Sequence, residues 1–136
     1  MSNTRFATLI HILTILAKNP DQWVNSTWIA ASIGLNPVIV RKELLALQEN
    51  GLVVSKKGKG GGSKLNKPCS EITMEDIYRV VRTTNALGKK NKCHDTDCPI
   101  GKNINRELGK LFQEVDEILS NTLRDWQLKK FVSEFD

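Results

Sequence analysis

The sequence is poor in cysteine and has no long apolar run, and both absences exclude classes of protein. Only three cysteines occur among 136 residues. In an intracellular protein, which the absence of a secretory signal predicts, we expect three cysteines to be thiols or metal ligands rather than structural disulfides. The longest apolar run, residues 6–17, is interrupted by His11 and Thr14 and is too short to cross a bilayer. No secretory signal is recognisable. We therefore expect a soluble, cytoplasmic protein with no membrane partner.

The chain also lacks the residue patterns of catalysis. We find no nucleophile beside a base, no phosphate-binding signature of an enzyme, and no paired carboxylates with an obvious pocket. The sequence therefore predicts that the protein is not an enzyme.

Acidic residues are scarce in the first half of the chain. Residues 1–67 contain nine Lys and Arg against three Asp and Glu, whereas residues 68–136 contain eleven against twelve. The net charge of +5 therefore arises in the first half. We expect that half to face a polyanion.

The first 34 residues have the pattern of two helices joined by a tight turn. Apolar residues recur at helical spacing in residues 4–18 and predict a buried helix. They are Phe6, Leu9, Ile10, Leu13 and Leu16. Asn25 or Ser26 can cap a second helix that runs through Ile33. Gly34 then allows the turn into the next helix.

The following stretch predicts a helix with one packing face and one exposed face. Asn36 can accept hydrogen bonds from the free amides of the first turn, and Pro37 has a preset φ and needs no donor. The packing face consists of Val40, Leu44 and Leu47. The other face consists of Val38, Arg41, Lys42 and Leu45. Asn50 and Gly51 end the helix.

A basic, glycine-rich hairpin follows this helix. The apolar residues 52–54 suit a strand, and lysines and glycines fill the interval up to Leu65. The lysines are Lys56, Lys57, Lys59 and Lys64. Lysines gain affinity for duplex DNA by displacing condensed counterions, and glycines let the backbone approach phosphates closely. The alternative is a solvated, disordered loop.

Helix, glycine-containing turn, helix and basic hairpin is the order of a winged helix-turn-helix. Residues 35–37, 44–53 and 57–65 resemble the Rrf-two family of bacterial transcription regulators. The family hairpin commonly has Arg and Tyr where this chain has Lys57 and Ser63. Lys57 keeps the positive charge without the planar guanidinium. The resemblance implies a regulator that binds DNA.

The second half predicts two more helices. Thr73 and Asp76 are typical of a capping box and predict a helix that runs to about Thr84. Beyond Pro99, apolar residues alternate in steps of four and three and predict a long helix with one apolar seam. The seam consists of Ile100, Ile104, Leu108, Leu111, Val115 and Ile118. Such a seam could pack on the chain's own core, whereas the resemblance implies a homodimer interface.

The last residues predict a short tail helix. Thr122 and Asp125 are similar to another capping pair, and the apolar residues Leu123, Trp126 and Phe131 accompany them. We expect this helix to begin there and to fold back against the first helix.

Candidate redox or metal chemistry is concentrated between Cys93 and Cys98. Thiolate and imidazole groups, including His94, are ligands for soft metals. Relatives that bind an iron–sulfur cluster have three cysteines here, so a cluster in this chain would need Cys69, His94 or a residue of the partner subunit. A thiol switch at Cys93, Cys98 or Cys69 and idle cysteines without a cofactor are the alternatives. Beside Pro99, Cys98 would lie at a helix N-terminus, which lowers a thiol pKa.

The predicted DNA contacts come from three segments. Val38, Arg41 and Lys42 would enter the major groove, with Asn36 near the backbone. The start of the second helix would contact phosphates through Ser26 and Thr27. The hairpin would grip the backbone or the minor groove through Lys56, Lys57, Lys59 and Lys64.

These features predict a mainly α fold with a small β-hairpin wing, built from a winged helix-turn-helix and a long dimerisation helix. We expect DNA binding by residues 1–68, a linking helix and cysteine-containing sensor loop in residues 69–98, and the dimerisation and C-terminal helices in residues 99–136. The predicted function is a homodimeric repressor that reads an inverted repeat in double-stranded DNA and responds to a redox or small-molecule signal. The alternative is a winged-helix protein-protein interaction module that does not bind DNA.

Overall fold

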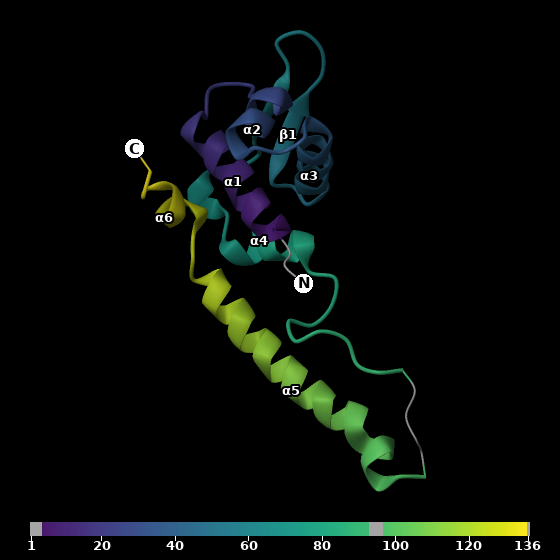
Figure 1. Ribbon diagram of the computed structural model, residues 1–136. Coiled ribbons are helices and arrows are strands. Elements are labelled where there is room, and N and C mark those ends of the chain that lie inside the picture. Colours follow the sequence, from purple (N-terminus) through teal and green to yellow (C-terminus); the bar gives the residue numbers. More distant parts are fainter. Residues whose placement is uncertain (1–3, 93–96, 136) are drawn as a thin grey trace. The chain divides into compact units, whose positions relative to one another are not determined.

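The computed structural model describes residues 4–92 and 97–135, and these residues form two compact units (Figure 1). The first unit contains the chain up to Val81 and again from Arg124 onward, and the second contains Arg82–Leu123. The described chain is mainly helical with one antiparallel hairpin. The predicted fold class is therefore confirmed.

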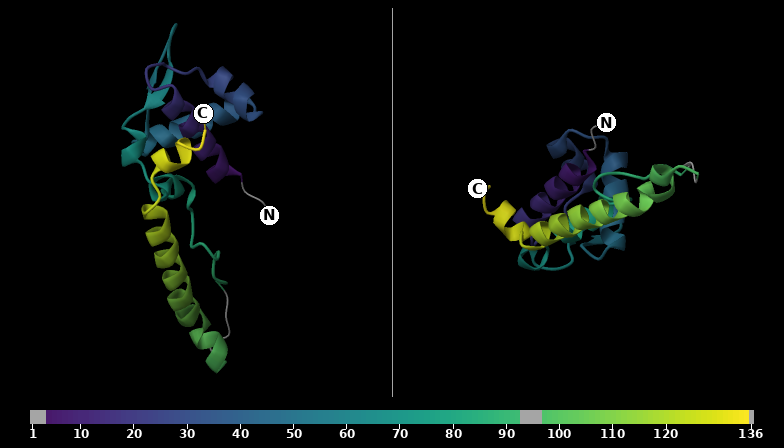
Figure 2. Two further views of the ribbon diagram at one scale, coloured as in Figure 1. Left: turned by 90° about the vertical axis from the view of Figure 1, so that its left-hand side faces the viewer. Right: turned by 90° about the horizontal axis from the view of Figure 1, so that it is seen from below.

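The first unit is a helical domain with a two-stranded wing (Figure 2). Its elements are α1 (Arg5–Lys18), α2 (Ser26–Ile33), α3 (Pro37–Glu49), β1 (Val53–Lys56), β2 (Gly62–Leu65), the 3-10 helix η1 (Cys69–Glu71), α4 (Met74–Val81) and α6 (Leu128–Val132). Helix α6 packs against α1, as the sequence predicted for the tail helix.

The core of this unit forms where the apolar stripes of the helices meet the wing. Helix α1 contributes Leu9, Leu13 and Leu16, which are buried as their spacing predicted. The other elements add Ile29, Val40, Leu47, Val53, Ile72, Ile77 and Leu128. Because α2 and α3 both bury residues in this core, their orientation is fixed by packing.

Helices α2 and α3 begin at the residues that the sequence predicted, and a side chain caps each start. Asn25 Oδ1 accepts a hydrogen bond from the Thr27 N–H at 2.7 Å. Asn36 Oδ1 accepts one from the Val38 N–H at 2.9 Å. Gly34 lies between the helices with φ +83°, a left-handed conformation that ends α2 without strain. The predicted helix-turn-helix boundaries are therefore confirmed.

The predicted capping box opens α4. The Thr73 N–H donates to Asp76 Oδ2 at 3.0 Å, and the Asp76 N–H donates to Thr73 Oγ1 at 3.2 Å. The helix ends at Val81, so the prediction that it continues to about Thr84 was wrong. The chain turns instead, with the Gly88 N–H donating to the Asn85 carbonyl, and threonine and asparagine side chains favour such turns over helix.

Glu75 on α4 is buried and forms two ion pairs. Arg79 Nη2 lies 2.6 Å from its Oε1, and Arg124 Nη2 lies 3.1 Å from its Oε2. Burial raises the pKa of this carboxyl, but the hydrogen bonds from the two guanidinium groups outweigh burial and hold the pKa below its ordinary value of 4.5. Through Arg124, Glu75 connects α4 to the C-terminal part of the unit.

Glu75→Gln is expected to make the protein less sensitive to acid. A carboxyl with a lowered folded pKa stabilises the fold above its ordinary pKa, and this stability is lost as pH falls through the folded value. The variant should lose about 1 kcal/mol at neutral pH, because both arginines are half exposed and screened, and should unfold with a smaller dependence on pH below 4.5. Thermal unfolding from pH 3 to pH 7 measures both effects. Glu71→Gln, which changes an exposed carboxylate, is the control. Identical pH profiles for the parent and Glu75→Gln would contradict the role of Glu75.

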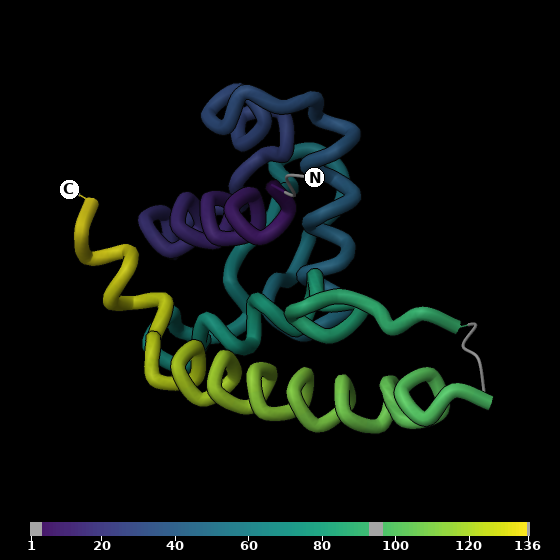
Figure 3. Tube along the Cα trace, turned by 60° about the horizontal axis from the view of Figure 1, so that its bottom comes forward, coloured from purple at the N-terminus to yellow at the C-terminus, as the bar shows by residue number. Residues whose placement is uncertain are grey.

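The second unit contains most of the long helix α5 (Pro99–Arg124), with residues 82–92 running beside it (Figure 3). Asp116 on α5 holds this segment by accepting hydrogen bonds from the Ala86 N–H at 2.8 Å and from the Asn85 side chain. These two bonds lower the pKa of Asp116, with the backbone bond the larger cause. The predicted long helix is confirmed.

The predicted start of the tail helix was wrong. Thr122 lies inside α5, and α6 begins only at Leu128. No proline or glycine lies between Lys110 and Asp125 to break α5. The chain leaves the helix where it pairs with Ile72 and with the first residue of α4: the Met74 N–H donates to the Trp126 carbonyl at 2.8 Å, and the Leu128 N–H donates to the Ile72 carbonyl at 2.7 Å. The end of α5 is therefore set by hydrogen bonds to residues that are far away in the sequence.

Candidate nucleic-acid interface

Helix α3 presents the face that the sequence predicted to be exposed. Val40, Leu44 and Leu47 are buried, while Arg41 and Lys42 are exposed. Val38 is 62% exposed and Leu45 is 54% exposed. Two cations between apolar side chains on a capped helix can contact phosphates, guanine edges and thymine methyl groups.

A bidentate ion pair fixes the other side of α3. Arg5 Nε donates to Glu43 Oε2 and Arg5 Nη2 donates to Glu43 Oε1, each at 2.8 Å. The hydrogen bond to Glu43 raises the pKa of the guanidinium. Glu43 is 4% exposed, so the pair joins the start of α1 to the inner face of α3. This ion pair keeps Glu43, the acidic residue in the middle of α3, away from the exposed face of the helix.

The wing is docked on the segment before α2. Strands β1 and β2 pair antiparallel with Ser55 opposite Ser63. Val24 adds a bridge to β2: the Val24 N–H donates to the Ser63 carbonyl at 3.0 Å, and the Ser63 N–H donates to the Val24 carbonyl at 2.9 Å. Gly62 makes this approach possible, since a Cβ there would lie 2.5 Å from the Val24 carbonyl oxygen. Strand β2 is therefore attached to the body of the unit near the end that borders the loop of residues 57–61.

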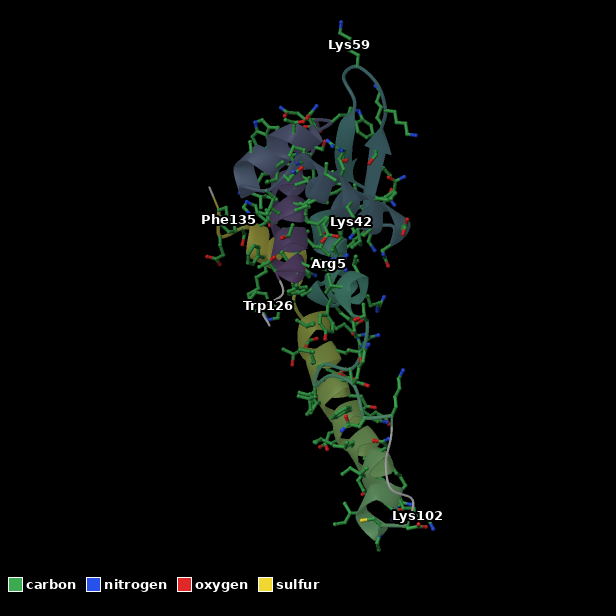
Figure 4. The ribbon with its side chains drawn as sticks, turned by 45° about the vertical axis from the view of Figure 1, so that its right-hand side comes forward. Arg5, Lys42, Lys59, Lys102, Trp126 and Phe135 are labelled. Carbon is green, nitrogen blue, oxygen red and sulfur yellow. The ribbon has the colours of Figure 1, made fainter. Side chains whose placement is uncertain are left out.

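Trp23 contacts two of the wing lysines. The Nζ atom of Lys64 lies 4.8 Å from the centre of the Trp23 ring, and that of Lys56 lies 5.9 Å from it. These distances are typical of cation–π contacts. The sequence predicted Lys64 as a DNA contact but gave no sign of this ring contact, because Trp23 and Lys64 are far apart in the chain. Lys57 and Lys59 lie at the tip, and Lys59 points away from the unit (Figure 4).

A groove of about 530 Å³ lies between α3, the start of α2 and the wing. It brings together four of the predicted DNA contacts: Ser26, Arg41, Lys56 and Lys57. Its described lining includes these cations and no Asp or Glu. A concave, positively charged surface with serine hydroxyls suits a polyphosphate backbone.

The other predicted contacts lie outside the lining of this groove. They are Thr27, Asn36, Val38, Lys42, Lys59 and Lys64. The groove also includes Gln48 and Leu45, which the list of predicted contacts omitted. Gln48 follows Arg41 by seven residues and so shares its helix face, and this spacing could have identified it.

The cysteines lie in different parts of the chain. Cys69 begins η1 in the first unit, Cys98 directly precedes α5 in the second, and Cys93 and His94 lie outside the described residues. Within residues 4–92 and 97–135, no three His, Cys, Asp or Glu side chains gather as metal ligands. The described side chains therefore do not supply the ligand set of an iron–sulfur cluster.

Cys98 has the environment that the sequence predicted for it. Hydrogen bonds from the backbone N–H groups of Gly101 and Ile100, in that order of effect, hold the pKa of the Cys98 thiol below its ordinary value. These amides belong to the free first turn of α5, where a negative charge is stabilised. The thiol is also half exposed.

Much of the apolar seam of α5 is uncovered. Ile100 is 73% exposed, Ile118 is 61% exposed and Leu111 is 49% exposed, and Ile104 is also exposed. Leu108 and Val115 are half-buried. A row of exposed apolar side chains on one helix is typical of a surface that another protein covers.

Comparison with known proteins places the chain in a family. The sequence model of the Rrf2 family, described as an iron-dependent transcriptional regulator, matches residues 2–134. The chain belongs to the Rrf2 family. It is 33% identical over 129 residues to the putative HTH-type transcriptional regulator YwnA of Bacillus subtilis strain 168, covering 95% of each chain. The Rrf2 resemblance in the sequence is therefore confirmed, and the chain is a transcription regulator rather than an enzyme.

Solved structures of other regulators share this fold. A putative transcriptional regulator from Lactobacillus plantarum is similar with a TM-score of 0.79 and 24% identity, over 96% of this chain and 89% of that one. The global cysteine regulator CymR of B. subtilis has a TM-score of 0.73 and 21% identity, over 100% and 98% of the two chains. Among the described helices of the present chain, none is both long and apolar enough to cross a membrane.

Proposed function

We propose that this Rrf2 regulator binds an inverted repeat in duplex DNA as a cytoplasmic homodimer and represses transcription until a redox or small-molecule signal arrives. The observation that carries the proposal is the groove that joins Ser26, Arg41, Lys56 and Lys57. Three separate elements supply these side chains, and the part of the groove lining that the structure describes includes no Asp or Glu.

Each part of the interface has a separate role in this proposal. Val38, Arg41 and Lys42 read base edges in the major groove. Asn36, Ser26 and Thr27 contact the backbone near helix N-termini, where free amides and hydroxyls suit phosphates. The wing grips the backbone or the minor groove with Lys57 and Lys59 at its tip and Lys56 and Lys64 along its strands. We propose that residues 1–68 bind DNA and that residues 69–98 form a linking helix and a sensor loop. Residues 99–136 form the dimerisation helix and the C-terminal helix.

The exposed seam of α5 supports the homodimer. A two-fold pair of these helices would cover Ile100, Ile104, Leu111 and Ile118 against their copies. The same symmetry would present two α3 helices to two half-sites, which explains the inverted repeat. The lowered pKa of the Cys98 thiol supports a redox signal, because the thiolate is the form that oxidants attack.

Arg41→Ala is expected to relax sequence preference. Arg41 is exposed on α3 and lines the groove, where its planar guanidinium can bind a guanine edge in bidentate fashion. The variant should bind its operator more weakly by about 1–3 kcal/mol and bind unrelated duplexes nearly as well as the parent does. Gel-shift titration of the region upstream of its gene, against a scrambled duplex, measures the difference. An equal loss on both duplexes would show that Arg41 contacts phosphate only.

Lys59→Ala is expected to weaken binding to every duplex by the same factor. Lys59 extends from the tip of the wing, where its flexible ammonium can neutralise a phosphate (Figure 4). The plot of log affinity against log salt should become shallower by about 0.9 for each lost contact. Lys129→Ala, on α6, provides a control of the same chemical change outside the groove. Parallel salt plots for Lys59→Ala and the parent would exclude a phosphate contact.

A further inference from the structure

The first unit contains a second cavity, which shares no lining residue with the basic groove. Its volume is about 670 Å³, within the range of sites for small organic ligands. Helix α1 forms one wall with Phe6 and Ile10, α2 contributes Trp28, and the C-terminal segment contributes Phe131 and Phe135. Nearly all of the accessible lining is apolar.

The aromatic walls are held in place by ring contacts. Phe6 meets Tyr78 edge to face with ring centres 5.9 Å apart, and Phe131 meets Phe135 at 5.4 Å. Trp28 nevertheless remains 56% exposed although it lies on a short helix of the core. Such a large apolar surface left open inside a concave site favours an apolar ligand.

The polar groups of the cavity are basic or neutral. Lys18 and His11 lie on the α1 wall, and among residues 4–92 and 97–135 the lining includes no Asp or Glu. The Lys18 ammonium donates one hydrogen bond to the Phe135 carbonyl. An ammonium has three N–H groups, so it can still donate to an anion. The ligand that complements this cavity is therefore a small apolar molecule that carries one negatively charged group.

The first turn of α2 lines both cavities. Asn25 and Ser26 line the basic groove, while Trp28 lines the apolar cavity. The Asn25 cap bonds the Thr27 N–H and makes this turn one rigid piece. A ligand that displaces Trp28 would move Ser26 and the edge of the groove with it.

We propose that this cavity binds a small apolar carboxylic acid, with its chain or ring against Trp28 and the phenylalanines and its carboxylate on Lys18, and that its occupancy changes the affinity for DNA. The second half of this statement deepens the function proposed above and rests on it. The site itself does not depend on DNA binding.

Octanoate, as the probe acid, tests the site in the absence of DNA. Isothermal titration of the full chain should show saturable binding of octanoate, and octylamine, a cation of the same length, should bind at least tenfold more weakly. Lys18→Gln should weaken octanoate binding roughly tenfold, since a charge-assisted hydrogen bond is lost. Lys129→Gln, the same change on α6 outside the cavity, should leave it unchanged. Trp28→Phe should abolish the change in tryptophan fluorescence that octanoate causes.

Several results would overturn the site. These are no saturable binding at millimolar octanoate, equal binding of octylamine, or equal behaviour of Lys18→Gln and Lys129→Gln. Octanoate affinity that falls as protein concentration rises would mean that a second copy occupies the cavity, and would also overturn it.

The link to DNA is tested by repeating the duplex titration with saturating octanoate. The affinity for the duplex should change by the same factor by which DNA changes the affinity for octanoate, because such coupling is reciprocal. Octanoate binding with an unchanged DNA affinity would overturn the link. Octanoate binding by a chain that ignores DNA would instead count against the function proposed above and leave the site standing.

Discussion

Ile118→Asp is expected to convert the proposed dimer to monomers and to abolish the proposed tight binding to an inverted repeat. Ile118 is 61% exposed on the seam of α5 and would be buried against its copy in the dimer. An unpaired carboxylate buried in an apolar interface costs at least about 2 kcal/mol, and two-fold symmetry applies this cost twice, so the dissociation constant should rise about a thousandfold. Sedimentation velocity across a range of protein concentrations measures the change.

Lys102→Asp is the matched control for this variant. It places the same side chain on α5 at an exposed position, which the helical period puts on the other side of the helix from the seam. This control should dimerise as the parent does. If Ile118→Asp remains a dimer, or if both variants dissociate alike, the seam is not the dimer interface and the explanation of the inverted repeat fails with it.

Gly62→Ala is expected to detach the wing from the body of the first unit. The new Cβ would lie 2.5 Å from the Val24 carbonyl oxygen and 2.7 Å from the Trp23 carbonyl carbon. These are backbone atoms, which cannot turn away as a flexible side chain can. The two hydrogen bonds between Val24 and Ser63 must therefore break. This costs about 2 kcal/mol of stability, and loss of the ordered wing lysines should weaken DNA binding about tenfold or more.

Gly60→Ala separates this effect from the general cost of replacing a glycine. Gly60 lies in the same hairpin with φ +76°, and a Cβ there meets nothing within 4 Å. Its replacement should cost about 1 kcal/mol of local backbone strain and leave the bridge to Val24 intact. Thermal unfolding and DNA titration of both variants measure the contrast. Equal losses for the two would mean that docking on Val24 does not hold the wing.

The features that the sequence predicted well are those encoded by neighbouring residues. Asn36 followed by Pro37 marks a helix start because both effects act within one turn. Gly34 and the Thr73-Asp76 pair act over equally short distances. The apolar spacing of α1 and α3 depends only on the helical period. The caps confirm these helix starts, and burial confirms the stripe of α3 and Leu9, Leu13 and Leu16 of α1. Phe6 and Ile10, which the spacing also predicted to be buried, are only half-buried.

The features that the sequence missed depend on residues far apart in the chain. The pairing of Ile72 and Met74 with the segment around Trp126 decides where α5 stops and α6 begins. The docking of Ser63 on Val24 places Lys64 over Trp23. The apolar cavity joins α1, α2 and the C-terminal segment. The sequence of each of these segments does not indicate which other segment of the chain it contacts.

The central claim is that the cations of α3 and the wing exist to bind a duplex. The most direct test is a fluorescence anisotropy titration of the purified chain with the duplex upstream of its gene, at salt concentrations from 50 to 200 mM. If Lys57 and Lys59 of both subunits each neutralise one phosphate, log affinity should fall against log salt with a slope steeper than about −3. No binding in 50 mM salt, or an affinity independent of salt, would contradict this account and favour a winged-helix protein that binds other proteins.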